Sequence, residues 1–178
     1  MRAILMTVAL ALAAGGSKNG GQDDLLKVLP KAKLSLADGI KQLTKGNEVA
    51  ISGKFEMHEG HLALSVYTVE KGLGEDPEHN VLKEFLGSPE GAEWKPEVEV
   101  FKDVPHVSRS AMQLTIMSLS KVTLLDVIAK AEKDGKGMVY SINPKLRDRK
   151  AVFVVLVSAD GKSSDFLYDA MTGDAVKK

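Results

Sequence analysis

The strongest constraint on the fold is a pattern that occurs twice in the chain. Residues Lys33–Gln42 (KLSLADGIKQ) align without a gap on Lys121–Lys130 (KVTLLDVIAK). In each copy a hydroxyl residue, Ser35 or Thr123, precedes an apolar run, and an aspartate follows three residues later. This spacing is typical of a capped helix start, because the hydroxyl and the carboxylate satisfy backbone groups of the first turn. The alignment therefore predicts an internal repeat and explains both aspartates as caps rather than catalytic acids.

Alternating apolar and polar residues follow each predicted helix. In the first half, residues 49–57 and 61–69 alternate around a glycine turn, which predicts a β-hairpin. In the second half, residues 138–146 and 151–158 predict another hairpin, and residues 164–168 predict a third strand. Each half is expected to be a helix that covers one face of an antiparallel sheet, which gives an α+β fold.

The first half departs from this plan where its third strand is due. A long segment includes a predicted short helix at Asn80–Leu86 and the only tryptophan, Trp94. Pro96–Phe101 alternates and is predicted to be the delayed third strand. Ser108–Ser120 is predicted to be a connecting helix. For Trp94, packing in a satellite core is favoured over a role as a binding anchor.

The first residues indicate export. Met1 and Arg2 supply a positive charge, Ala3–Ala14 is apolar apart from Thr7, and small residues follow. This pattern predicts a signal peptide at residues 1–16 and a periplasmic or secreted protein. The apolar run is shorter than the roughly 20 residues of a membrane-spanning helix, so no permanent span is expected. The chain has no cysteine, which argues against a lipoprotein and excludes disulfides.

Composition limits the classes of partner and the domain organisation that the chain can have. The 24 Lys+Arg balance the 24 Asp+Glu, so the chain lacks the positive field with which nonspecific nucleic-acid binders neutralise phosphates. Residues 17–30, which begin with a polar, glycine-rich stretch, are predicted to be a flexible leader. The predicted units are residues 31–104, with an insertion, and residues 105–178. Each would bury too little surface alone, so they are expected to pack together.

The end of the chain carries a family resemblance. Phe166–Asp174 (FLYDAMTGD), with the preceding helix and hairpin, resembles the PepSY family over residues 121–176. A fainter copy covers residues 33–70. The resemblance implies two PepSY-like units packed together, each a sheet curled around a helix, and a role in binding or restraining peptidases. It brings no catalytic residue and no cofactor, so a non-enzymatic protein that binds or inhibits a peptidase or another polypeptide is the leading expectation.

The same ending has a local physical explanation. Asp169 and Thr172 are expected to accept hydrogen bonds from turn amides, and Gly173 is expected to take the positive φ that closes such a turn.

Five residues are candidates for binding. Trp94, Arg147 and Arg149 are the candidates for partner binding: Trp94 as an aromatic anchor, and the two arginines because the turn at residues 147–150 concentrates positive charge that could meet an acidic surface. The alternative is a charged hairpin tip that keeps the sheet soluble. His58 and His61 flank a turn and could share a metal ion, but zinc needs three or four ligands, so a solvated turn is favoured. A small-molecule or metal-ion-binding envelope protein remains the alternative function.

The predicted strand Pro96–Phe101 is a candidate peptide-binding edge. If Pro96–Phe101 lies at a sheet edge, its free backbone groups could accept an extended peptide. Its glutamates could equally block such pairing.

Overall fold

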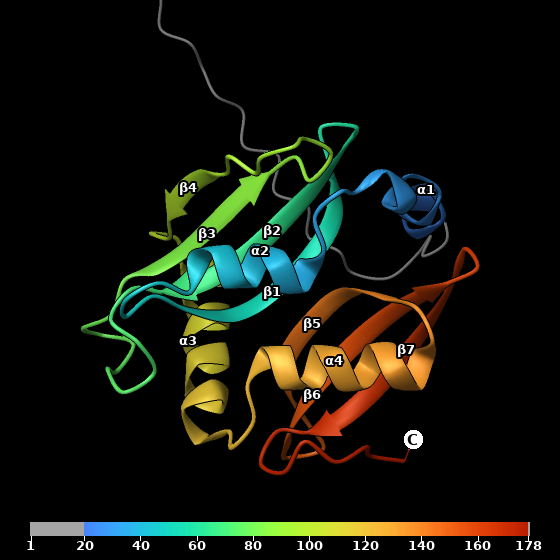
Figure 1. Cartoon of the computed structure of the whole chain (residues 1–178). Coiled ribbons are helices and arrows are strands. Elements are labelled where there is room, and N and C mark those ends of the chain that lie inside the picture. Colours follow the sequence, from blue (N-terminus) through green and yellow to red (C-terminus); the bar gives the residue numbers. More distant parts are fainter. Residues whose placement is uncertain (1–19, 178) are drawn as a thin grey trace, which may run out of the picture.

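Seven antiparallel strands form one continuous sheet in the computed structural model, which describes residues 20–177 (Figure 1). The strand order is β4-β3-β2-β1-β5-β6-β7. Four α-helices and one short 3-10 helix accompany the sheet within residues 20–177. The fold class is α+β, as the sequence predicts. The predicted signal peptide at residues 1–16 lies outside the described residues.

The first repeat contains one helix and three strands. Helix α2 spans Leu36–Leu43, and the hairpin consists of β1 at Val49–His58 and β2 at His61–Val69. Strand β3, at Leu82–Gly87, pairs with β2. The edge strand β4 follows at Glu97–Val100 and pairs with β3.

The second repeat has the same order of elements. Helix α4 spans Leu124–Gly135, β5 spans Met138–Arg147, β6 spans Lys150–Ala159 and β7 spans Lys162–Asp169. The predicted second hairpin and its third strand are therefore confirmed. The helix and three strands of one half thus correspond to those of the other, with β4 as an addition to the first.

The helical prediction for Asn80–Leu86 is wrong. Leu82–Gly87 forms the third strand of the first repeat, in register with Leu64–Val69 of β2. Its apolar residues recur at spacings that also suit a helix, but pairing with β2 decides the conformation, as tertiary context often does for short segments. Pro96–Phe101, predicted as the delayed third strand, contains β4, which is a fourth strand.

The flexible leader predicted for residues 17–30 is also wrong over its described part. Helix α1 spans Gly20–Val28 and a 3-10 helix spans Leu29–Lys31. Leu25, Leu26 and Leu29 are buried in the common core. The prediction followed the polar residues that precede these leucines and overlooked the apolar face of the helix. Burial of that face offsets the conformational entropy lost when the segment becomes ordered.

Both predicted helix caps are confirmed. Ser35 Oγ accepts a hydrogen bond from the Asp38 backbone N–H at 3.1 Å. Thr123 Oγ1 accepts one from the Asp126 N–H at 3.2 Å, and Asp126 Oδ2 accepts one from the Thr123 N–H at 2.9 Å. The two halves therefore begin with equivalent elements, as the internal repeat requires.

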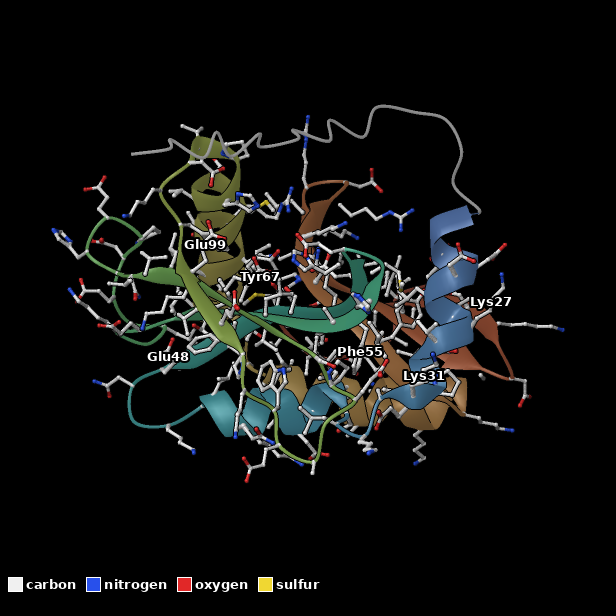
Figure 2. The ribbon with its side chains drawn as sticks, turned by 90° about the horizontal axis from the view of Figure 1, so that it is seen from above. Lys27, Lys31, Glu48, Phe55, Tyr67 and Glu99 are labelled. Carbon is white, nitrogen blue, oxygen red and sulfur yellow. The ribbon has the colours of Figure 1, made fainter. Side chains whose placement is uncertain are left out.

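The helices occupy both faces of the sheet. Helices α2 and α4 cover one face, and α3, at Val104–Leu119, lies on the other (Figures 1 and 2). Helix α3 contains most of the predicted Ser108–Ser120 helix but starts earlier, because Asp103 caps it. The largest fully buried apolar side chains come from both repeats and include Leu36, Ile51, Leu64, Leu114, Ile128, Ile142, Phe153 and Tyr168.

The two repeats meet at a short seam in the middle of the sheet. Strands β1 and β5 pair only at Gly53↔Ile142 and Lys54↔Ser141. Gln113 of α3 strengthens the seam: its Oε1 accepts from the Ser52 hydroxyl of β1, and its Nε2 donates to Asn143 Oδ1 of β5, both at 3.0 Å. The sheet and the core thus run across the predicted boundary between residues 104 and 105, and the halves pack together as expected.

Within residues 20–177, no single helix is both long and apolar enough to span a membrane. The bent pair formed by α3 and α4 passes the length and composition criteria only when the two helices are taken together.

Candidate functional site

Strand β4 forms one edge of the sheet and is exposed along its whole length. Val98 and Val100 are 54% and 43% exposed. Large apolar side chains at a sheet edge are more informative than exposed charges, because an exposed apolar edge strand is a template for pairing with another chain. Val104, at the start of α3, is also exposed.

Two residues of β4 direct their backbone N–H and C=O groups toward the free edge of the sheet. The Phe101 N–H donates to the Leu82 carbonyl at 3.0 Å, so Phe101 faces β3. Inward and outward backbone groups alternate along an antiparallel strand. The backbone N–H and C=O groups of Glu97 and Glu99 therefore form hydrogen bonds with β3. The N–H and C=O groups of Val98 and Val100 point away from the sheet.

The carboxylates of β4 lie on the opposite face from its valines. Glu99 (Figure 2) lies directly opposite Glu84 of β3, and Glu97 lies opposite Leu86. Glu84 already accepts a hydrogen bond from the Ser65 hydroxyl at 2.5 Å. The outer part of this face thus carries two carboxylates side by side, and like charges on paired strands repel.

Aromatic packing fixes the end of β4. The buried Phe101 ring lies 5.5 Å from the Tyr67 ring and 4.9 Å from the His106 imidazole, measured between ring centroids. His106 Nδ1 lies 2.7 Å from Asp103 Oδ1, and hydrogen bonding by His106 holds the pKa of Asp103 below its usual value. The strand is therefore anchored to both the sheet and α3.

Lys83 braces β3 on the side of the valines. Its ammonium group donates to Glu48 at 3.3 Å and pairs with Glu70. Burial opposes its charge, but the hydrogen bonds and charges of Glu70 and Glu48 outweigh this effect and raise the pKa of Lys83. This lysine lies opposite Val100 in the ladder and is already committed to acidic partners.

The other edge of the sheet is partly covered by the chain itself. Ala175 forms a β-bridge with Tyr168, and the Val176 N–H donates to the Leu167 carbonyl at 2.8 Å. The segment after β7 thus pairs with the last residues of that strand. In the described part of the chain, sheet pairing ends at β4 without such a cover.

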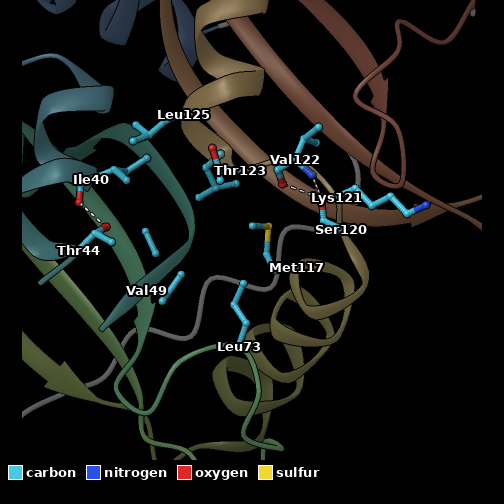
Figure 3. A pocket seen from close by; sticks show the side chains of 12 residues that line it. Ile40, Thr44, Val49, Leu73, Met117, Ser120, Lys121, Val122, Thr123 and Leu125 are labelled. Atoms are coloured by element: carbon cyan, nitrogen blue, oxygen red, sulfur yellow. Dashed lines mark hydrogen bonds between the residues drawn. The ribbon is translucent and has the colours of Figure 1, made fainter. Parts of the chain in front are cut away.

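An apolar pocket of about 250 Å³ opens where the two repeats meet (Figure 3). Its polar lining groups are hydrogen-bonded internally. The Thr44 hydroxyl donates to the Ile40 carbonyl, and the Ser120 hydroxyl lies within hydrogen-bond distance of the Val122 and Ala170 carbonyls. The pocket therefore offers mainly hydrocarbon to a ligand. Its lining comprises Ile40, Thr44, Val49, Ala50, Leu73, Met117, Ser120, Lys121, Val122, Thr123, Leu124 and Leu125.

The C-terminal turn supports one wall of this pocket. Asp169 Oδ1 accepts hydrogen bonds from the Met171 and Thr172 amides, Thr172 Oγ1 accepts one from the Asp174 amide, and Gly173 has φ +75°. These contacts confirm the predicted turn. A Cβ at residue 173 would lie 3.0 Å from a methyl group of Val122, so the glycine is also needed for close packing against the pocket wall.

Trp94 lies inside the molecule. The residue is 9% exposed and belongs to the common core, beside Gly87. The indole Nε1 has no hydrogen-bond partner among the described residues. This placement supports core packing over a role as an exposed partner-binding anchor.

Arg147 and Arg149 lie at the exposed β5–β6 turn, where Asp148 and Arg149 have positive φ. The turn itself is confirmed. Strands β3, β2 and β1 separate β5 from β4 in the sheet. The structure therefore does not bring the predicted partner-binding residues together into one site.

His58 and His61 face each other across the exposed β1–β2 turn. Glu59, Lys95 and Glu97 line the same shallow cavity. Within residues 20–177, the carboxylate and imidazole groups that converge closely enough for metal binding are instead Glu75, Asp76 and His79. His79 Nδ1 there lies 3.1 Å from Asp76 Oδ2, and hydrogen bonding by His79 lowers the pKa of Asp76.

Sequence reasoning identified β4 as a possible edge strand but not its exposed valines. The alternation of glutamate and valine in residues 97–100 was the available signal, although it normally indicates a half-buried strand. The apolar pocket was missed entirely, because residues from α2, the loop at Leu73, the end of α3 and the start of α4 meet only after folding.

Comparisons with known proteins give a distant structural likeness. No model of a known protein family matches the chain, and no curated protein matches it. A solved structure of a putative lipoprotein from Clostridium difficile 630 matches with a TM-score of 0.41 and 12% sequence identity. The alignment covers 82% of this chain and 92% of that protein.

Proposed function

We propose that this chain is an exported, non-catalytic protein that binds another polypeptide by adding an extended segment of it to the free edge of β4. The observation that carries the proposal is an exposed edge strand whose two valines direct backbone groups outward. The resemblance of Phe166–Asp174 to the PepSY family supports a secreted peptidase as the partner and brings no catalytic residue. The sequence of residues 1–16 supports export.

Strand addition uses backbone hydrogen bonds for affinity and side chains for selection. Val98 and Val100 each offer one N–H and one C=O to an incoming strand. A four-residue strand is about 14 Å long, so the bound segment is short.

Proline substitution tests this mode of binding. Proline is tolerated in an edge strand where its nitrogen faces solvent, so Val98→Pro removes an outward donor while it keeps the pairing of β4 with β3. The matched control Val98→Thr keeps the donor and is compatible with a strand. The purified proteins are tested by gel filtration and inhibition assays against a panel of secreted peptidases.

The expected result is a complex formed by the unmodified protein and by Val98→Thr, but lost in Val98→Pro. Circular dichroism must show that all three proteins are folded. Equal binding by Val98→Pro and the unmodified protein would exclude β4 as the docking strand. If no peptidase in the panel binds or is inhibited, peptidases are rejected as the partner class.

The apolar pocket favours a second candidate function, the binding of a small apolar molecule. Its volume of about 250 Å³ exceeds the roughly 150 Å³ of an apolar cavity that holds benzene. Titration with indole, followed by NMR, is expected to shift the signals of Val122 and Leu125. The variant Leu125→Trp should fill the pocket and abolish the shifts. Unchanged spectra of the unmodified protein would reject this alternative.

A further inference from the structure

We infer that the segment that adds to β4 alternates basic and apolar residues. This inference rests on the proposed function and specifies the partner's chemistry. It follows from the two faces of β4, which carry Glu97 and Glu99 on one side and Val98 and Val100 on the other. Because side chains of a strand alternate between faces, an added strand must match both faces at once.

The acidic face favours a cation in the partner. Glu99 has Glu84 directly opposite it on β3, so the position on its other side is the only lateral place where a neighbouring strand can supply compensating charge. Paired residues of opposite charge stabilise adjacent strands, and like charges destabilise them. Lysine or arginine opposite Glu97 or Glu99 therefore replaces repulsion by attraction.

Three nearby lysines of the chain contact other carboxylates. Lys83 points to the valine face and binds Glu48 and Glu70. Lys95 lies 3.0 Å from Glu93. Lys54 lies 2.5 Å from Glu56, although it also attracts Glu84. The contacts described for these lysines therefore leave Glu97 and Glu99 available to a basic partner.

The valine face selects apolar residues at the alternate positions. Val98 lies opposite Phe85, which is partly buried against the core. An apolar side chain on the far side of Val98 would extend this row and remove exposed hydrocarbon from water. A wholly basic segment would leave that hydrocarbon exposed, so alternation is preferred to charge alone.

The same arrangement rejects a second copy of this chain as the occupant. If two β4 strands paired with their valines on one face, their glutamates would lie opposite one another. Repulsion between these like charges opposes self-pairing. The glutamates thus prevent edge-to-edge association between copies and at the same time select a basic partner.

Two synthetic peptides test the inference on the full mature protein. One alternates lysine and valine, and the other alternates glutamate and valine. In a third peptide, proline replaces the central valine of the first. In an antiparallel added strand this valine lies opposite a valine of β4 and donates its N–H to it, so the third peptide measures charge attraction without strand addition. Fluorescence anisotropy at low and high salt gives the affinities.

The lysine peptide is expected to bind about tenfold more tightly than the glutamate peptide, because two like-charged pairs become two attractive pairs. Salt should weaken this preference, since the charges are exposed. The double variant E97K/E99K should reverse it. The matched control Glu78→Lys changes an exposed glutamate in the β2–β3 loop and should leave the preference unchanged.

The outcomes separate the two proposals. If the lysine and glutamate peptides bind equally, or if E97K/E99K does not alter the preference, the basic partner is rejected while strand addition stands. If the proline-containing peptide binds as well as the lysine peptide, or if no peptide binds, strand addition at β4 is rejected as well.

Discussion

Asp126 shows how a single cap links pH to stability. The side-chain and backbone hydrogen bonds of Thr123 lower the pKa of Asp126 from its usual 3.8. A carboxylate whose pKa is lowered by folding stabilises the protein above its unfolded-state pKa, and this contribution is lost as the pH falls through the folded-state value. The same logic applies to Asp38, whose pKa is lowered mainly by Ser35.

Asp126→Asn is therefore expected to lower the melting temperature at neutral pH. The difference from the unmodified protein should shrink as the pH falls below 3.8 and through the lowered folded-state pKa, where Asp126 becomes neutral like the asparagine. Thermal unfolding followed by circular dichroism measures it, with Asp160→Asn in the β6–β7 turn as the control. A difference that persists undiminished in acid would contradict the capping explanation.

Local rules predicted these residues well. Ser35, Thr123 and Asp169 each act on backbone groups within three residues, so their spacing in the sequence was sufficient. The exposure of Val98 was not predictable in this way. Alternation shows that a strand has two different faces, but only the position of β4 at the edge of the sheet decides that its valines remain exposed.

At the scale of elements, strand pairing decided the segments that sequence patterns misjudged. Residues 80–86 have an apolar spacing that suits a helix, yet β2 offered a free edge and Leu82–Gly87 formed a six-residue ladder on it. Residues 20–30 were judged by their polar beginning, although their leucines pack into the core. Both errors concern contacts between segments distant in sequence, which local propensity does not contain.

The two orientations within β4 predict unequal losses of stability when proline is introduced. Glu99→Pro removes a donor that faces β3 and is expected to destabilise the protein by about 1–3 kcal/mol. Val98→Pro removes only an outward donor and is expected to cost less. Urea unfolding of both variants measures the difference. An equal or larger loss for Val98→Pro would show that the assigned hydrogen-bonding directions in β4 are wrong.

At the scale of the whole molecule, the repeats are expected to unfold together. They share one core, and Gln113 joins β1 to β5 across their short seam. Trp94 fluorescence and circular dichroism should therefore follow one coincident transition in guanidinium. Two separated transitions would show that the halves are independent despite their continuous sheet.

Gln113→Leu should lower the stability of this single unit. The substitution removes a partner from Ser52 and from Asn143, which is expected to cost about 1–3 kcal/mol. Gln42→Leu, at an exposed position of α2, serves as the control. The midpoint of guanidinium unfolding gives the comparison, and equal midpoints for the two variants would show that the Gln113 bridge contributes little.

Strand addition at β4 is tested most directly by amide hydrogen exchange with and without the peptide that alternates lysine and valine. If the peptide adds to β4, amide exchange slows at Val98 and Val100, whose N–H groups face the free edge, with little change at Glu97 and Glu99. Binding of the peptide with unchanged exchange at Val98 and Val100 would contradict strand addition at β4.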